Sequence, residues 1–277
     1  MTDFDAIDAI KRRHSCRTFL KDKPLDAECM KILRSALADA YNPFTGAHPM
    51  FALTDSHEDA SWGKIGTYGI IKNPAAYIVV GSGSDNTSTV AAGFMAQQAI
   101  LLATSVGMGS VWLGATFTRG RIQSAATFPD EYMIPAVIAL GYPAKPRLLE
   151  RAMRGISKAD TRKPWHQLFF YGSPDIPLTQ ETAGDFSLSL EMVRLAPSAT
   201  NTQPWRVVMN DTGFHFYAYY SESLSGMNLK HKMLDMGIAI CHFHLSAKQL
   251  NLPGKISVLH RTGEISPEYH YIASWLI

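Results

Sequence analysis

The chain has 277 residues, of which 46% are hydrophobic and 18% charged, a composition typical of one large or two small globular domains. Its net charge of +2 is scattered, and the absence of a Lys/Arg cluster interleaved with aromatic residues argues against nucleic-acid binding. The apolar runs are only as long as a strand, which predicts no membrane span. The N-terminus is acidic and lacks an apolar signal region, and the three cysteines are widely spaced without a disulfide framework. Together these features predict a cytoplasmic protein.

Apolar spacing and helix-breaking residues predict the elements of the N-terminal part. Two short helices are expected first, over residues 3–12, where Asp3 can cap, and over residues 24–41. A buried strand, a central helix that is apolar nearly all round and two further strands follow at residues 75–81, 90–106, 110–114 and 134–141. Residues 142–175 are charged and contain prolines, which indicates an extended arm.

A stretch rich in Pro, Thr, Ser and Gly at residues 173–184 predicts a boundary between two halves, 1–172 and 173–277. The second half is expected to hold helices at 186–196 and 229–250 and strands at 206–209, 213–220, 256–260 and 270–276. Two landmarks align the halves: residues 45–49 lie opposite 200–204, and Gly93 lies opposite Gly237. The chain therefore contains a predicted internal repeat.

Residues 13–19, Arg-His-Ser-Cys-Arg-Thr-Phe, directly follow the first helix. Arg13 and Arg17 offer two fixed cations, and arginine binds phosphate by charge-assisted, often bidentate hydrogen bonds. The alternative is a solvated basic helix end, which is favourable with the helix dipole.

A second segment, residues 196–205, reads Ala-Pro-Ser-Ala-Thr-Asn-Thr-Gln-Pro-Trp. Taken alone, it could be a helix-stopping loop with a core tryptophan. Together, the two segments resemble the FMN site of the nitroreductase family of flavoproteins, in which they come from different subunits of a dimer. Because both lie here in one chain, the sequence resembles the tandem, single-chain branch of that family.

The resemblance implies a set of cofactor contacts. They are Arg13, His14, Ser15, Arg17, Lys72, Gly114, Ala115, Arg162, Pro197, Ser198, Asn201 and Gln203. Arg162 would be a third phosphate cation, although Asp160 stands where relatives often have lysine. Lys72 would stabilise reduced flavin, but it is equally well a surface lysine beside a strand.

The resemblance also implies the fold and the activity. The expected fold is α+β, with two fused halves, each a mixed, mainly antiparallel sheet flanked by helices. FMN would pass hydride from NADH or NADPH to electron-poor acceptors such as nitroaromatics or quinones in a ping-pong reaction, and no catalytic acid or base is assigned. The alternatives are other flavin chemistry, such as ene reduction or dehalogenation, and a non-enzymatic flavin-binding or regulatory role.

Each half lacks one of the two motifs. Residues 42–49 have lost the serine and asparagine of the second motif, and no Arg-x-Ser-x-Arg precedes the helix of the second half. One complete site and one degenerate site are therefore expected per chain. A monomer would suffice for the complete site, and further oligomerisation would be possible.

Three further motifs suggest other chemistry but lack the residues that this chemistry needs. Cys241 and His244 share a helical face, but further ligands at zinc-like spacing are missing, so no metal is expected. Gly81 and Gly83 follow a strand without the rest of a dinucleotide fingerprint. Cys16 lies beside Arg17 without a nameable base or resolving partner.

Overall fold

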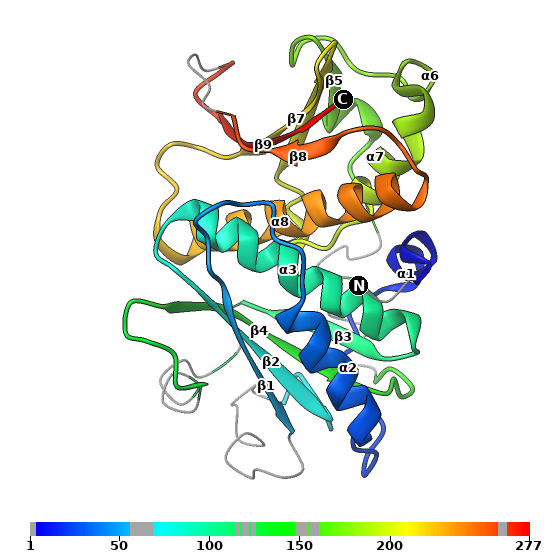
Figure 1. The fold of residues 1–277 in the computed structure, drawn as a ribbon, viewed down its shortest axis with the longest axis vertical. Coiled ribbons are helices and arrows are strands. Elements are labelled where there is room, and N and C mark those ends of the chain that lie inside the picture. The colour runs from blue at the N-terminus through cyan, green and yellow to red at the C-terminus, as the bar shows by residue number, and fades with distance from the viewer. Residues whose placement is uncertain are drawn as a thin grey trace.

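The computed structural model describes residues 4–55, 69–114, 126–147, 161–259 and 265–277, with single positions at 117, 122 and 155. Two β-sheets lie on opposite sides of two long helices, α3 (Asn86–Ser105) and α8 (Gly226–Gln249), which pack against each other (Figure 1). The predicted α+β class is confirmed by this arrangement.

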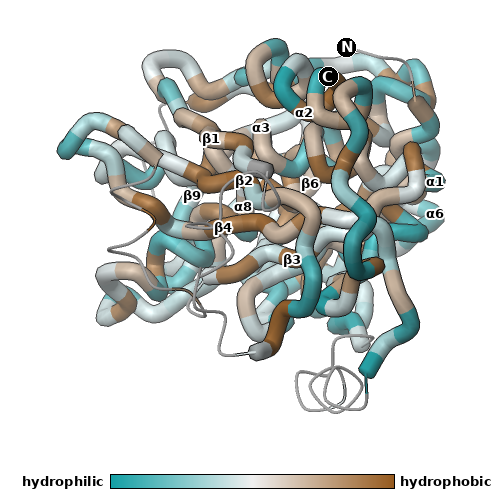
Figure 2. Tube along the Cα trace, turned by 90° about the horizontal axis from the view of Figure 1, so that it is seen from below, coloured by the Kyte–Doolittle hydropathy of each residue, from teal (hydrophilic) through white to brown (hydrophobic). Residues whose placement is uncertain are grey.

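The first sheet is antiparallel throughout and has the order β1-β2-β4-β3. Its strands are β1 (Met50–Asp55), β2 (Ala76–Ser82), β3 (Gly109–Leu113) and β4 (Met133–Gly141). Every residue of β2 is buried, because apolar side chains cover both faces of the sheet; α2 (Ala27–Ala38) packs on one of them. A strand buried on both faces is apolar without alternation, and Figure 2 shows brown stretches of tube at β2 and β4.

The second sheet is mixed and has the order β5-β6-β7-β9-β8, with β5 parallel to β6. Its strands are β5 (Phe169–Tyr171), β6 (Trp205–Asn210), β7 (Gly213–Tyr219), β8 (Lys255–Ser257) and β9 (Tyr269–Leu276). β6 and β7 form a hairpin, and in its turn the side chain of Asn210 accepts the Thr212 N–H at 2.9 Å. The short helices α6 (Gln180–Ala183) and α7 (Ser187–Arg194) precede this hairpin.

The two long helices touch through glycines in a reciprocal way. A Cβ built on Gly93 would lie 2.3 Å from the carbonyl oxygen of Leu234, and one built on Gly237 would lie 2.0 Å from that of Val90. Each contacted residue stands three positions before the glycine of its own helix. Contacts of this kind, in which i meets j and j meets i, are typical of twofold symmetry. The Gly93–Gly237 landmark of the predicted repeat therefore coincides with a local twofold contact.

Most predicted elements are present, and the differences concern a helix cap, two strands and the short helix α6, which lies in the predicted boundary stretch. Asp5 caps α1 (Ala6–Arg12) by accepting the Asp8 N–H at 2.8 Å, whereas the expected cap, Asp3, lies outside the described residues. β1 was not predicted. Nor was β5, which lies in the expected extended arm and becomes a strand by pairing with β6, far along the chain.

None of the helices in the described part of the chain is both long and apolar enough to cross a bilayer.

Candidate functional site

The basic segment after α1 is an extended chain that lies beside the first sheet. The Cys16 N–H donates to the Ser110 carbonyl of β3 at 2.9 Å, which places Ser15 next to that strand. Further along, the Lys72 N–H donates to the Arg17 carbonyl at 2.9 Å. The backbone thus holds three predicted site residues, Ser15, Arg17 and Lys72, in one place, although the Lys72 side chain is exposed.

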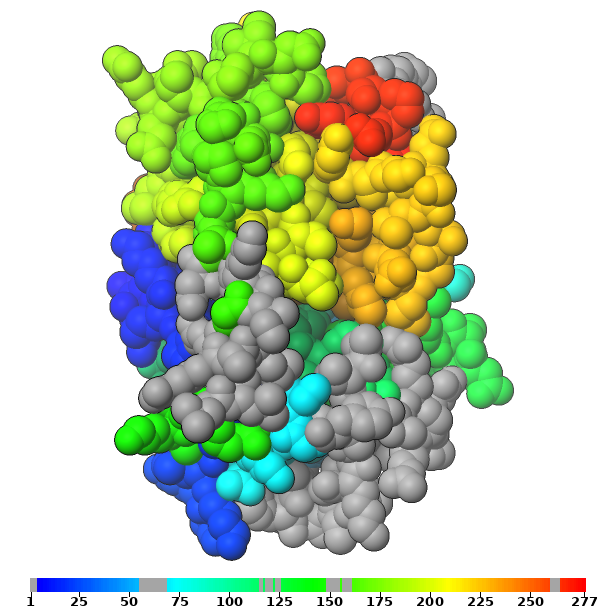
Figure 3. All heavy atoms as spheres, turned by 180° about the vertical axis from the view of Figure 1, so that it is seen from behind, coloured from blue at the N-terminus to red at the C-terminus, as the bar shows by residue number. Residues whose placement is uncertain are grey.

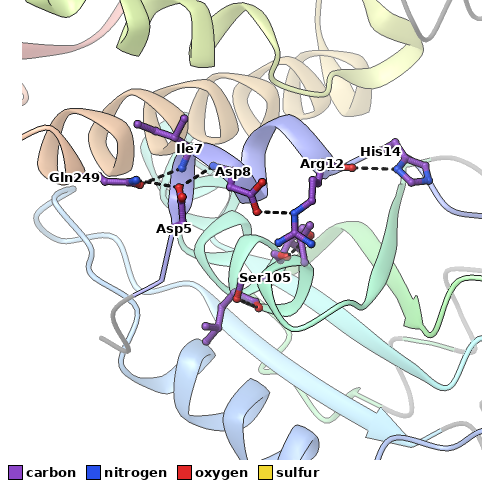
Figure 4. A network of polar contacts seen from close by, with 10 residues as sticks. Asp5, Ile7, Asp8, Arg12, His14, Ser105 and Gln249 are labelled. Atoms are coloured by element: carbon purple, nitrogen blue, oxygen red, sulfur yellow. Dashed lines mark hydrogen bonds and ion pairs between the residues drawn. The ribbon is translucent and has the colours of Figure 1, made fainter.

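The second half of the chain holds the start of α1. Gln249, at the end of α8, accepts the Ile7 N–H at 3.1 Å and donates to the Asp5 carboxylate at 2.9 Å (Figure 4). The first N–H groups of a helix have no partner within the helix, so such a side chain fixes its position. Figure 4 also shows His14 turned onto the Arg12 carbonyl, to which its ring Nδ1 donates at 3.1 Å. His14 is exposed, so no described contact joins it to the other predicted site residues.

In the loop between α7 and β6, backbone N–H groups are hydrogen-bonded within the loop itself. The Gln203 N–H donates to the Ser198 hydroxyl at 2.9 Å, and the Asn201 N–H donates to the Ser198 carbonyl at 3.0 Å. Positive φ angles at Thr200, Asn201 and Gln203 (50°, 57° and 49°) make this tight path possible. Because these amides are used within the loop, it offers a ligand mainly side chains.

Residues 161–163 are bound to this loop by side-chain hydrogen bonds. Asn201 donates to the Thr161 carbonyl at 3.0 Å, and the Gln203 side chain accepts the Lys163 N–H at 2.8 Å. Arg162 in turn donates to the Leu195 carbonyl at 3.3 Å. The structure therefore brings Arg162, Asn201 and Gln203 together, with Pro197 half-buried in the same loop.

Two arginines from distant segments lie near one buried histidine. Burial, together with the positive charges of Arg13 and Arg162, lowers the pKa of His242 to about 3, against the effect of its hydrogen bond to Met192. Both guanidinium groups must therefore be close enough to act on the same imidazole ring. Arg13, from the first segment, and Arg162, from before β5, therefore act on the same histidine of α8.

A buried chain of hydrogen bonds fixes His242 in its neutral form. Its Nδ1–H donates to the Met192 carbonyl at 2.9 Å, so Nε2 accepts from the Gln97 amide, also at 2.9 Å. The other end of that amide accepts the Trp112 indole N–H at 3.2 Å. The chain runs from β3, through both long helices, to the end of α7, and so connects the strand and the loop that form the two sides of the site.

Three polar residues of α8 share the face turned toward the site: His231, Asp235 and His242, at the spacing i, i+4 and i+11. Asp235 is buried, and its two oxygens accept the Ala199 N–H at 3.0 and 3.1 Å. A Cβ built on Gly114, at the end of β3, would lie 2.8 Å from Nε2 of His231.

No role was predicted for these three residues. Polar side chains at helical spacing on an otherwise apolar helix were the available signal. Of the predicted contacts, Ala115 lies outside the described residues.

Replacing Asp235 by asparagine should stabilise the protein increasingly as the pH rises. Burial raises the pKa of Asp235 well above its usual 3.8, despite the Ala199 N–H and Lys232. Between 3.8 and the raised value the folded protein holds a proton that the unfolded chain has released, so stability falls by about 1.4 kcal/mol per pH unit across that window. An asparagine side chain cannot ionise and still accepts the Ala199 N–H.

Thermal unfolding of Asp235→Asn and of the wild type at pH 4, 6 and 8 would check this prediction. The control Asp22→Asn, at an exposed site, should have nearly the same Tm as the wild type at each pH. A Tm gain for Asp235→Asn that is the same at every pH would contradict a titration effect.

Comparisons with known proteins give a consistent result. A family model described as "Putative TM nitroreductase" matches residues 5–247. A solved "putative nitroreductase" from Thermotoga maritima MSB8 has 18% identity and a TM-score of 0.63, covering 100% of this chain and 95% of that one. The search of curated proteins finds no match.

Two further solved structures align with about half of the chain. An FMN-dependent nitroreductase from Clostridium difficile R20291 has 20% identity and a TM-score of 0.44, covering 51% of this chain and 89% of that one. The NfrA1 nitroreductase from B. subtilis has 18% identity and a TM-score of 0.43, covering 53% and 72%.

Proposed function

Since the chain belongs to the family described as "Putative TM nitroreductase", we propose that it is an FMN-dependent oxidoreductase. It takes hydride from NADH or NADPH and reduces electron-poor acceptors such as nitroaromatics or quinones. The observation that carries this proposal is the hydrogen-bond chain from Trp112 of β3 through Gln97 and His242 to the Met192 carbonyl, which joins the strand beside the arginine segment to the helix that leads into the polar loop.

The residues present fit an FMN phosphate. Two guanidinium groups, from segments that are far apart in the sequence, lie near the same imidazole, with Arg17 and Ser15 on the same extended segment. Such a donor set suits a dianion, because charge-assisted hydrogen bonds to phosphate are short and strong. Asn201 and Ser198 offer polar groups for the ribityl chain, and Gly114 lets a flat ring approach the backbone.

When bound, the flavin supplies the hydride chemistry. The protein's residues hold and orient it: Arg13, Arg17 and Arg162 neutralise the phosphate, and the loop at 197–203 forms the wall contributed by the second half. The neutral state of His242 keeps a further positive charge out of the buried region near the arginines. The positive charge of Lys72 would stabilise the reduced flavin ring.

The chain acts as a fused pseudo-dimer whose halves are residues 1–172 and 173–277. The reciprocal contact of Gly93 and Gly237 supports this division. Since the arginine segment and the polar loop are joined covalently, a monomer holds the whole cofactor site, and self-association is not required. We place the enzyme in the cytoplasm and expect small-molecule partners.

Purified protein should be yellow and should release one FMN per chain. Denaturing the protein and measuring released FMN against protein concentration gives the stoichiometry. Anaerobic NADH or NADPH should then bleach the flavin, and a nitroaromatic or quinone should restore its spectrum. Two flavins per chain would contradict the single site, and a chain without affinity for FMN would overturn the proposal.

Flavin that binds but is not bleached by either nicotinamide would indicate a binding protein. Flavin that is bleached but not reoxidised by these acceptors would indicate another flavin reaction, such as ene reduction or dehalogenation.

A further inference from the structure

The hydroxyl group of Ser110 is buried beside the arginine segment, residues 13–19. Ser110 of β3 is 2% exposed, its Oγ atom is shielded from solvent, and that atom forms no hydrogen bond with any residue that the structure describes. A buried hydroxyl without a partner costs free energy, and an alanine at the same position would avoid that cost. An acceptor from outside the chain would remove the cost while keeping the serine.

Backbone contacts place Ser110 next to the residues that the proposed function assigns to the phosphate. The Cys16 N–H donates to the Ser110 carbonyl at 2.9 Å, and Ser15 forms a parallel bridge with Ser110. Nε of Arg13 and Nη1 of Arg17 are shielded from solvent, as the Ser110 hydroxyl is, so parts of both guanidinium groups lie inside the protein. A phosphate bound to them can therefore lie within reach of a buried side chain.

The Ser110 side chain lies on the face of the first sheet that is turned toward the long helices. Side chains two positions apart in a strand share a face, and Trp112 donates its indole N–H to Gln97 of α3. The residue opposite Ser110 on β4 is Leu140, so the neighbouring strand supplies no side-chain acceptor there.

The arginine segment itself begins at the border between the two halves. The helix that precedes it, α1, contacts α7 of the second half. Figure 3 shows this border from behind, where the blue atoms of the N-terminal segment lie directly below yellow-green atoms of the second half. A cofactor held between the halves therefore meets the arginine segment and the strand beside it together.

We propose that the Ser110 hydroxyl donates a hydrogen bond to the FMN phosphate, as a further contact of the cofactor site. This inference rests on the proposed function. A phosphate monoester offers three strong acceptor oxygens, and the guanidinium groups approach them from the arginine segment. The hydroxyl adds a neutral donor from the strand. Because the strand already fixes its position, little side-chain freedom is lost when the phosphate binds.

Two variants test this contact. Ser110→Ala removes the hydroxyl and leaves the strand otherwise unchanged. Thr54→Val is the matched control, because Thr54 lies in β1, at the opposite edge of the same sheet, and its Oγ1 is likewise shielded without a hydrogen bond to a described residue. For each full-length chain, fluorescence quenching measures the affinities for FMN and riboflavin, phosphorus NMR observes the bound phosphate, and chemical denaturation without flavin measures stability.

Ser110→Ala should bind FMN roughly 10- to 100-fold more weakly, the loss expected when a charged group loses one hydrogen bond. It should bind riboflavin as tightly as the wild type does. At saturating FMN, its phosphorus resonance should differ from that of the wild type. The flavin-free variant should be at least as stable as the wild type, because the hydroxyl has no partner in the chain to lose. Thr54→Val should keep both affinities and the wild-type resonance.

An unchanged FMN affinity in Ser110→Ala would place the hydroxyl away from the phosphate, and equal losses for FMN and riboflavin would show that it supports the fold. A less stable flavin-free variant would show that the hydroxyl already has a partner within the chain. Each of these results overturns the inference while leaving the proposed function intact. A wild-type chain that bound neither flavin would instead remove the proposed function itself.

Discussion

Gly237→Ala should destabilise the protein by on the order of 3 kcal/mol, the upper end of what overpacking usually costs. The added Cβ would lie 2.0 Å from the Val90 carbonyl oxygen and 2.7 Å from the Phe94 backbone nitrogen. Backbone atoms inside a helix cannot rotate away as a side chain can, so α3 and α8 must separate. Chemical denaturation of the flavin-free protein measures the loss directly.

The reciprocal contact between α3 and α8 leads to a second prediction. Gly93→Ala should cost a similar amount, because its Cβ would lie 2.3 Å from the Leu234 carbonyl oxygen. Gly155→Ala is the control, since Gly155 has helical backbone and no atom within 4 Å of an added Cβ. If Gly93→Ala and Gly237→Ala were as stable as the control, the backbones of α3 and α8 would not be in contact at these glycines.

Replacing both Arg13 and Arg162 by alanine should weaken FMN binding by about 3–6 kcal/mol, roughly 10²- to 10⁴-fold, because each charge-assisted hydrogen bond to phosphate contributes about 1.5–3 kcal/mol. Each single variant, and Arg17→Ala, should lose part of this. Riboflavin carries no phosphate, so its affinity should change far less. Fluorescence quenching on titration with each ligand gives both constants.

Arg34→Ala, at an exposed position of α2, is the matched control for the loss of a positive charge. It should leave both affinities as they are. A double variant that lost FMN and riboflavin equally would show that these arginines support the fold rather than bind the phosphate.

The sequence pattern predicted the segments of the candidate site better than their contacts. Residues 13–17 and 197–203 stood out because together they resemble the FMN site of the nitroreductase family. His231 and Asp235 did not, because their importance depends on where α8 crosses the first half. That crossing is decided by two glycines 144 positions apart and by backbone contacts that no local pattern contains.

Strands are subject to the same limit. The apolar run of β2 is sufficient to predict a buried strand, since both of its faces are covered. The three residues of β5 carry no such pattern and become a strand only because β6 provides hydrogen-bonding partners. Lys72 shows the limit for a single side chain: the sequence does not predict that its backbone N–H donates to the Arg17 carbonyl while its side chain is exposed.

The position of β5 has a consequence for how the chain could be divided. A cut after Gly172 would leave an N-terminal fragment that carries the edge strand of the other fragment's sheet. That other fragment would carry Gln249, which holds the start of α1. Each piece would thus need the other to complete its own structure, as in fragment complementation. The two halves form an interlocked pair, and neither is a self-sufficient module that could be exchanged by itself.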